Sequence, residues 1–221
     1  MNEVLEQLAT CIERGKVNLN SPFPPDLKGE LGADELTKQA LEEGIAPNSI
    51  LNDSLMIGMG KIGDKFEAGK AFIPDMLIAA KAMNAAMVHL KPFFETGEVV
   101  LKGDFIIGTV AGDLHDIGKN IVRMVLTGSG WNVIDLGTDV KPEKFVETLK
   151  EYPKAIIGMS ALLTTTMMQM EVATKAIKEV SPNTRVFVGG APLSKDFSDK
   201  IGADGYFPDP NKFVKHLASV V

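Results

Sequence analysis

Apolar side chains in the first 96 residues recur at the spacing of amphipathic helices. Between Val4 and Ile12 they fall at three- and four-residue intervals, and Gly15 follows as a helix stop. Segment 18–30 holds three prolines and a glycine and cannot continue that helix. Three further helices are predicted, over Ala33–Glu43, from Asn48 or Ser49 onward, and from about Pro74 onward. This pattern is typical of a small four-helix bundle.

After Thr96 and Gly97 the pattern changes to short β-rich runs, each followed by a helical segment. The predicted strands are Asp104–Val110, Trp131–Leu136, Ala155–Met159, Arg185–Val188 and Gly205–Phe207. The predicted helices cover roughly residues 117–128, 142–151, 166–180, 194–201 and 210–220. Alternating strands and helices predict a five-stranded parallel sheet in a flavodoxin-like, doubly wound fold, with a ligand crevice at the carboxyl ends of its strands.

We therefore predict an α/β protein with two domains. A helical cap would occupy residues 1–96 and a flavodoxin-like domain residues 97–221, with the boundary near 97–103. The net charge of −6 argues against nucleic acid or an anionic membrane as the main partner. The single cysteine, Cys11, excludes an internal disulfide, and neither a signal peptide nor a membrane-spanning apolar run is visible. These features predict a cytoplasmic protein.

The loop after the first predicted strand, AGDLHDIGKN, holds the first candidate chemistry. Asp113 and His115 lie where this architecture binds its ligands. By themselves they leave alternatives open, because a loop histidine is more often solvated and Asp113 can cap the next helix. A metal site built from side chains is poorly supported, since no cysteine or second histidine lies nearby at ligand spacing. His89 and His216 fall on predicted helices and are most simply surface or packing residues.

The spacing of residues further along the chain decides between these alternatives. Asp113-x-His115-x-x-Gly118 is followed by Ser160-x-Leu162 and then by a pair of glycines, Gly189 and Gly190. The identities fall at the ends of the first, third and fourth predicted strands. This DxHxxG, SxL and GG pattern resembles the signature of the cobalamin-binding domain shared by methionine synthase, corrinoid methyltransfer proteins and several mutases.

The resemblance implies that the protein binds cobalamin with the cofactor's benzimidazole displaced from cobalt. His115 would be the lower axial ligand of the cobalt, and Asp113 would hold the other ring nitrogen. Thr166 lies where methionine synthase has a serine that extends this relay. The displaced nucleotide tail needs a slot beside the sheet. The residues expected around the loop and along that slot are Gly112, Leu114, Asp116, Gly118, Ser160, Leu162, Thr164, Gly189 and Gly190.

The helical half carries a second resemblance. Residues 58–83, GMGKIGDKFEAGKAFIPDMLIAAKAM, are similar to the helical cap of methionine synthase and of small corrinoid proteins. The resemblance implies that Phe66, Ile73 and Met76 face the methyl group on cobalt. An apolar lid would protect that bond and a reduced cobalt. The alternative for each is a core position, since a Met or Phe at helical spacing packs in the core as readily.

The resemblance also implies a role. The chain would be the corrinoid subunit of a multi-component methyltransferase system, carrying a methyl group on cobalt between partners. A donor-specific methyltransferase would load the methyl group and an acceptor methyltransferase would pass it to tetrahydrofolate or a thiol, with a reductive activase restoring the cobalt. The alternatives are a cobalamin-responsive regulator, a storage protein and an adenosylcobalamin mutase small subunit. A lone tryptophan, Trp131, and no visible basic helix-turn-helix segment argue against the regulator. The methyl donor, the oligomeric state and the corrinoid's native lower base are not predicted.

Overall fold

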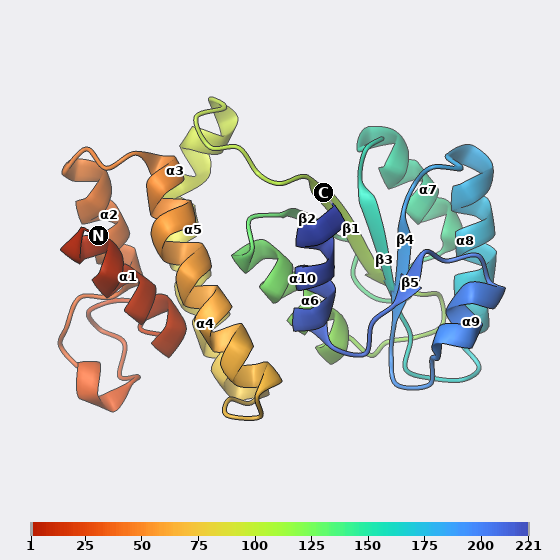
Figure 1. Ribbon diagram of the computed structural model, residues 1–221, viewed down its shortest axis with the longest axis horizontal. Coiled ribbons are helices and arrows are strands. Elements are labelled where there is room, and N and C mark those ends of the chain that lie inside the picture. The colour runs from red at the N-terminus through yellow and green to blue at the C-terminus, as the bar shows by residue number, and fades with distance from the viewer. Residues whose placement is uncertain (1, 221) are drawn as a thin grey trace. The chain divides into compact units, whose positions relative to one another are not determined.

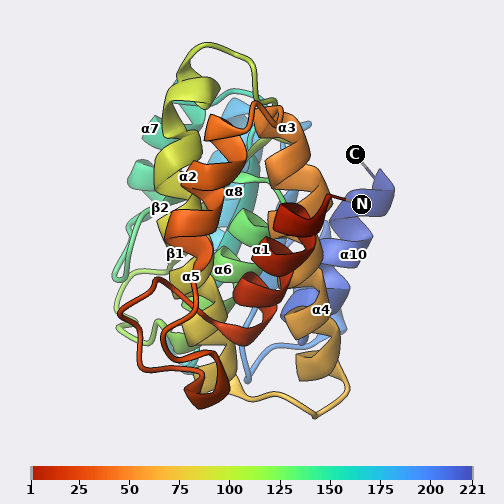
Figure 2. The ribbon, with the colours of Figure 1, turned by 90° about the vertical axis from the view of Figure 1, so that its left-hand side faces the viewer.

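The periodicity of the first hundred residues is realised as a set of packed helices. In the computed structural model, which describes residues 2–220, one unit comprises 2–101 together with 124–130. Its helices are α1 (Glu3–Arg14), α2 (Ala33–Glu42), α3 (Pro47–Ile50), α4 (Met56–Glu67) and α5 (Ile73–Glu95), with a 3-10 turn at Pro25–Leu27 and a π-helical turn at Leu51–Leu55. The π-helical turn joins α3 to α4, so the predicted third helix is one continuous run. Figure 2 shows α1, α2, α4 and α5 of this unit.

The helix ends follow ordinary capping chemistry. The Asn2 side chain accepts a hydrogen bond from the Val4 amide, and Gly15 closes α1 in the left-handed conformation at φ 72°. At α5 the Asp75 carboxylate accepts a hydrogen bond from the Phe72 amide at 2.8 Å. None of the described helices is long and apolar enough to cross a membrane.

Helices α1 and α4 approach each other closely because Gly58 has no side chain. A Cβ at this position would lie 2.5 Å from the carbonyl oxygen of Ala9 and 2.6 Å from the Cβ of Ile12. Gly60, two residues further along α4, is exposed, and a Cβ there would meet nothing within 4 Å. Gly58 is therefore needed for the close packing of α4 on α1, whereas Gly60 is not.

The second unit comprises residues 102–123 and 131–220 and contains the sheet (Figure 1). Its strands are β1 (Asp104–Thr109), β2 (Asn132–Asp135), β3 (Ile156–Ser160), β4 (Val186–Gly189) and β5 (Gly205–Tyr206). All neighbouring strands are parallel, and their order is β2-β1-β3-β4-β5. This is the flavodoxin-like order, so the predicted fold class is confirmed.

Helices cover both faces of this sheet. They are α6 (Ile117–Gly128), α7 (Pro142–Glu151), α8 (Met168–Val180), α9 (Lys195–Lys200) and α10 (Pro210–Val220). Ile106, Ile157 and Val188 point to the face that packs on α7 and α8. Because side chains alternate along a strand, their neighbours Phe105, Gly158 and Phe187 point to the opposite face, on which α10 and the first turns of α6 lie. The order reverses between β1 and β3, and the loops after these two strands meet there.

The matched glycines of α4 give a test of the helix packing. We expect Gly58→Ala to lower the free energy of unfolding by about 2 kcal/mol, because a methyl group overfills the contact with α1. Gly60→Ala should instead raise it by about 0.5–1 kcal/mol, because alanine costs less entropy in a helix. Urea denaturation of both variants measures the difference. Equal effects of the two substitutions would contradict the close approach of α1 and α4.

Candidate functional site

The site is organised by one buried carboxylate, that of Asp113, in the loop after β1. Asp113 is fully buried. Its Oδ1 accepts hydrogen bonds from the His115 amide at 3.0 Å and from His115 Nδ1 at 2.7 Å. Its Oδ2 accepts hydrogen bonds from the Thr166 hydroxyl at 2.6 Å and from the amides of Leu162 and Leu163 at 2.8 and 3.3 Å. One side chain thus ties the loop after β1 to the loop after β3.

These hydrogen bonds determine the charge of Asp113. Burial on its own raises the pKa of a carboxyl group. The hydrogen bonds from Thr166, Leu162 and His115 outweigh burial and hold the pKa of Asp113 well below its usual range. The carboxylate is therefore ionised at neutral pH and can only accept hydrogen bonds.

His115 acquires a defined tautomer from this partner. Because the Asp113 carboxylate only accepts, Nδ1 of His115 must carry the proton, which leaves a lone pair on Nε2. The side chain of His115 is 52% exposed, while that of Asp113 is 0% exposed. A histidine whose inner nitrogen is fixed by a carboxylate and whose outer nitrogen is accessible is the usual arrangement of a metal ligand.

His115 is a single donor. The described residues contain no group of three or more His, Cys, Asp or Glu side chains that could hold a metal ion. The donor set therefore fits a metal that arrives with most of its ligands already attached, as cobalt does in a corrin ring.

Two further residues hold the loop and were missed from the sequence. The buried Thr109 hydroxyl donates to the backbone carbonyl of His115 at 3.0 Å. Asp139 has a positive φ of 55°; its carboxylate accepts from the Gly112 amide at 2.7 Å and its own amide donates to the Asp113 carbonyl at 3.0 Å. Thr109 ends β1 and Asp139 follows β2, and neither belongs to the DxHxxG, SxL or GG pattern, so only the fold shows that they hold the loop.

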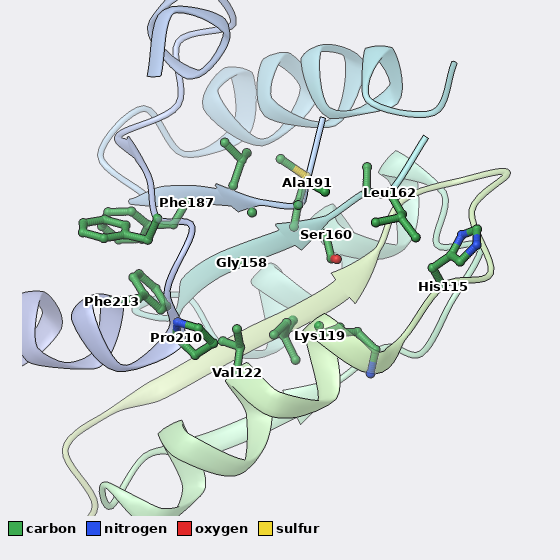
Figure 3. A pocket seen from close by; sticks show the side chains of 18 of the residues that line it. His115, Lys119, Val122, Gly158, Ser160, Leu162, Phe187, Ala191, Pro210 and Phe213 are labelled. Atoms are coloured by element: carbon green, nitrogen blue, oxygen red, sulfur yellow. The ribbon is translucent and has the colours of Figure 1, made fainter. Parts of the chain in front are cut away.

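A cavity of about 590 Å³ extends from His115 along the sheet (Figure 3). Of the residues expected from the sequence, Leu114, Asp116, Gly118, Ser160, Leu162, Gly189 and Gly190 line it together with His115. Gly112 and Thr164 do not; Thr164 is exposed, and Gly112 serves the loop through its bond to Asp139. Thr166 lies behind the loop that follows β1, among the hydrogen-bond partners of Asp113.

The glycines make this cavity possible. Gly190 has a φ of +142°, and a Cβ there would collide with the carbonyl oxygen of Ala161. A Cβ at Gly118 would meet no protein atom within 4 Å, although this residue lines the cavity, so it would occupy space open to a ligand. The cavity is within the usual size range of pockets that bury a cofactor-sized group. The residues present therefore fit the nucleotide tail of a corrinoid.

The expected cap residues lie in the helical unit and differ in exposure. Met76 is 1% exposed, which favours the core alternative for this side chain. Phe66 is half-buried and Ile73 is exposed. Phe72, which precedes α5, and Leu77 on α5 are also exposed.

A family model described as a B12 binding domain matches residues 103–214, and a second model of the same description matches residues 30–91. The chain is 40% identical over 200 residues to trimethylamine corrinoid protein 1 of Methanosarcina acetivorans, an alignment that covers 89% of this chain and 92% of that protein.

Two solved structures are also similar. A cobalamin-binding protein from Desulfitobacterium hafniense has a TM-score of 0.73 and 28% identity, with 98% of both chains covered. A chain of the methanol:cobalamin methyltransferase complex from Methanosarcina barkeri has a TM-score of 0.82 and 27% identity, covering 100% of this chain and 81% of that one.

The ionised Asp113 predicts a pH dependence of stability. At neutral pH, Asp113→Asn should lower the free energy of unfolding by about 2 kcal/mol or more. The NH2 group of the asparagine would replace a carboxylate oxygen and would face hydrogen-bond donors without being able to accept from them. The folded pKa of Asp113 is depressed. The ionised carboxylate therefore contributes to the free energy of unfolding at pH values above the pKa of an aspartate in the unfolded chain, about 3.9. This contribution is lost as the pH falls through the pKa of Asp113 in the folded protein.

Denaturation of both proteins without cofactor between pH 7 and pH 2.5 measures this contribution. The difference between wild type and Asp113→Asn should be constant at neutral pH and should shrink below about pH 4. A difference that does not change over this range would show that Asp113 is not held as a carboxylate.

Proposed function

The chain belongs to the family of B12-binding corrinoid proteins, and from this we propose that it carries a methyl group on cobalt between partner methyltransferases. Cobalamin is its cofactor. The relative from M. acetivorans is named for trimethylamine, and the similar structure from M. barkeri belongs to a methanol:cobalamin methyltransferase complex. The observation that carries the proposal is the accessible Nε2 of His115, fixed by Asp113 at the mouth of a cavity that fits the cofactor's tail.

In this proposal His115 would hold the cobalt of the cofactor through Nε2. Asp113 fixes the tautomer and orientation of the ring and increases its basicity as a ligand. Thr166 completes the relay by donating its hydroxyl to the far oxygen of Asp113. Thr109 and Asp139 hold the loop backbone, so that the ring keeps its position when the ligand above it changes.

The cavity would hold the displaced nucleotide tail. Gly118 provides space on the side of α6, and Gly189 and Gly190 line the cavity at the end of β4. Ser160 offers a hydroxyl near the His115 end. We further propose that the cap domain comprises residues 1–96 and the cofactor domain residues 97–221, with Phe66 and Ile73 on the cap protecting the methyl group.

When bound, cobalt supplies the chemistry, because its reduced Co(I) state is a strong nucleophile and its methylated state gives up the methyl group. The protein sets ligation and access. One methyltransferase would load the methyl group from a small donor such as a methylamine. Another would deliver it to tetrahydrofolate or a thiol, and a reductive activase would rescue oxidised cobalt.

The axial ligand can be tested by ultraviolet–visible spectroscopy of the protein loaded with hydroxocobalamin. His115→Ala should abolish the spectrum of histidine-ligated, base-off cobalamin, because the described residues that line the cavity include no other histidine. His89→Ala is the matched control, since His89 pairs with Asp34 within the helical unit. A histidine-ligated spectrum that persists in His115→Ala would refute the assignment.

The relay predicts a separate effect of Thr166. Thr166→Val keeps the shape of the side chain but removes the donor to Asp113. It should weaken binding of histidine-ligated cobalamin by about 10-fold, the lower end of the range for residues that support a metal ligand. Thr166→Ser keeps the hydroxyl and should bind nearly as wild type. Titration with cobalamin measures both constants, and equal affinity of the Val and Ser variants would remove Thr166 from the relay.

The carrier role is tested by methyl transfer. The reduced holoprotein is mixed with a candidate donor methyltransferase and its methylamine or methanol substrate, and the loss of the Co(I) absorbance is followed. We expect one methyl group to be taken up per cobalt, in a reaction that requires both proteins and that His115→Ala slows. Tight cobalamin binding without methyl transfer to or from any tested methyltransferase would instead favour storage or regulation.

A further inference from the structure

The cavity has two chemically different ends. At one end lie His115, Asp116 and Ser160, which carry polar side chains. At the other end lie Phe105, Val122, Gly158, Phe187, Pro210 and Phe213. Figure 3 shows His115 at one extremity and Phe187 and Phe213 at the other. We call the second set the aromatic end.

The aromatic end is densely packed. The ring of Phe105 lies directly over Gly158, since a Cβ on Gly158 would be 2.7 Å from its Cε1. Phe213 meets Phe105 with 5.6 Å between ring centroids and Phe187 with 5.1 Å, both edge to face. Phe105, Phe187 and Phe213 are 0, 4 and 5% exposed, so this end is shielded from water.

The side chains of the aromatic end offer no hydrogen bond, and Lys119, which lines the cavity one turn before Val122, donates from its Nζ to Asp135 at 2.6 Å. None of its six described residues carries a nitrogen or oxygen in its side chain. Pro210 has no amide hydrogen, and β3 is paired on both sides, so its peptide groups are taken up by the sheet. Tyr206 borders the cavity, but its side chain packs against the core on the other face of the sheet.

We propose that the aromatic end makes the protein selective for the lower base of its corrinoid, favouring a benzimidazole over a purine. This inference rests on the proposed placement of the nucleotide tail in the cavity. The two bases share a five-membered ring and differ in the six-membered ring, which is an apolar carbocycle in dimethylbenzimidazole. In adenine it carries two ring nitrogens and an exocyclic amine. Those groups lose their water at the aromatic end and find no partner there.

The test compares cobalamin with the cobamide that carries adenine, using the intact protein. Each dissociation constant for the base-off, histidine-ligated form is measured spectroscopically. It is then corrected for the base-off fraction of the free cobamide, obtained from that compound's own acid titration. We expect cobalamin to bind about 10- to 100-fold more tightly, the range expected for leaving buried polar groups unpaired.

Corrected constants within about threefold of each other, both with histidine ligation, would overturn the selectivity and leave the carrier role intact. Failure of both cobamides to bind in the histidine-ligated form would overturn the placement of the tail itself. The two failures are therefore distinguishable.

Variants at the aromatic end test whether these residues cause the selectivity. Phe213→Gln introduces a hydrogen-bonding side chain and should reduce the ratio of the two constants by about tenfold, whereas Phe213→Leu keeps the wall apolar and should preserve it. Circular dichroism confirms folding. Val122→Thr adds one hydroxyl at nearly constant shape and should also reduce the ratio, which keeps the test available if Phe213→Gln is unfolded. An unchanged ratio in the folded polar variants would contradict the proposal.

Discussion

The site depends on the burial of one carboxylate among donors. Asp113 has left water completely, which is costly unless its oxygens are bonded. His115, Thr166 and the amides after β3 supply those bonds. They come from two loops that are far apart in the chain and adjacent only because β1 and β3 are neighbours. The same interaction thus joins the loops, keeps Asp113 ionised and leaves one nitrogen of His115 accessible.

The fold was predictable because its signals are local and periodic. Strand and helix runs after residue 103 alternate clearly, as is typical of a doubly wound parallel sheet. Several boundaries differ by a residue or two, and one of these differences has its cause in the site. Helix α8 begins at Met168 rather than near 166, because the Thr166 hydroxyl is bonded to Asp113 and to the Leu163 carbonyl in a preceding turn. A tertiary hydrogen bond of this kind leaves no trace in periodicity.

The site was predictable only in part. Asp113, His115 and Thr166, which the resemblance grouped in a relay, are joined by hydrogen bonds. Thr109 and Asp139 were not found, since a hydroxyl or carboxylate that bonds a backbone group looks like any other loop residue in sequence. The aromatic end of the cavity was also hidden, because its phenylalanines look like ordinary core residues in sequence. The pleat places Phe105 and Phe187 on one face of the sheet, where Phe213 of α10 packs against both. Sequence identifies the histidine proposed as the cobalt ligand, whereas three-dimensional packing shapes the cavity beside it.

The central claim is that a protein imidazole replaces the cofactor's own base on cobalt. Electron paramagnetic resonance of the Co(II) state, with protein labelled with ¹⁵N only in its three histidines, tests it directly. Axial ligation by His115 predicts that the nitrogen superhyperfine triplets become doublets on labelling. Triplets that persist in the labelled protein would show that the benzimidazole remains on cobalt, and would contradict the account.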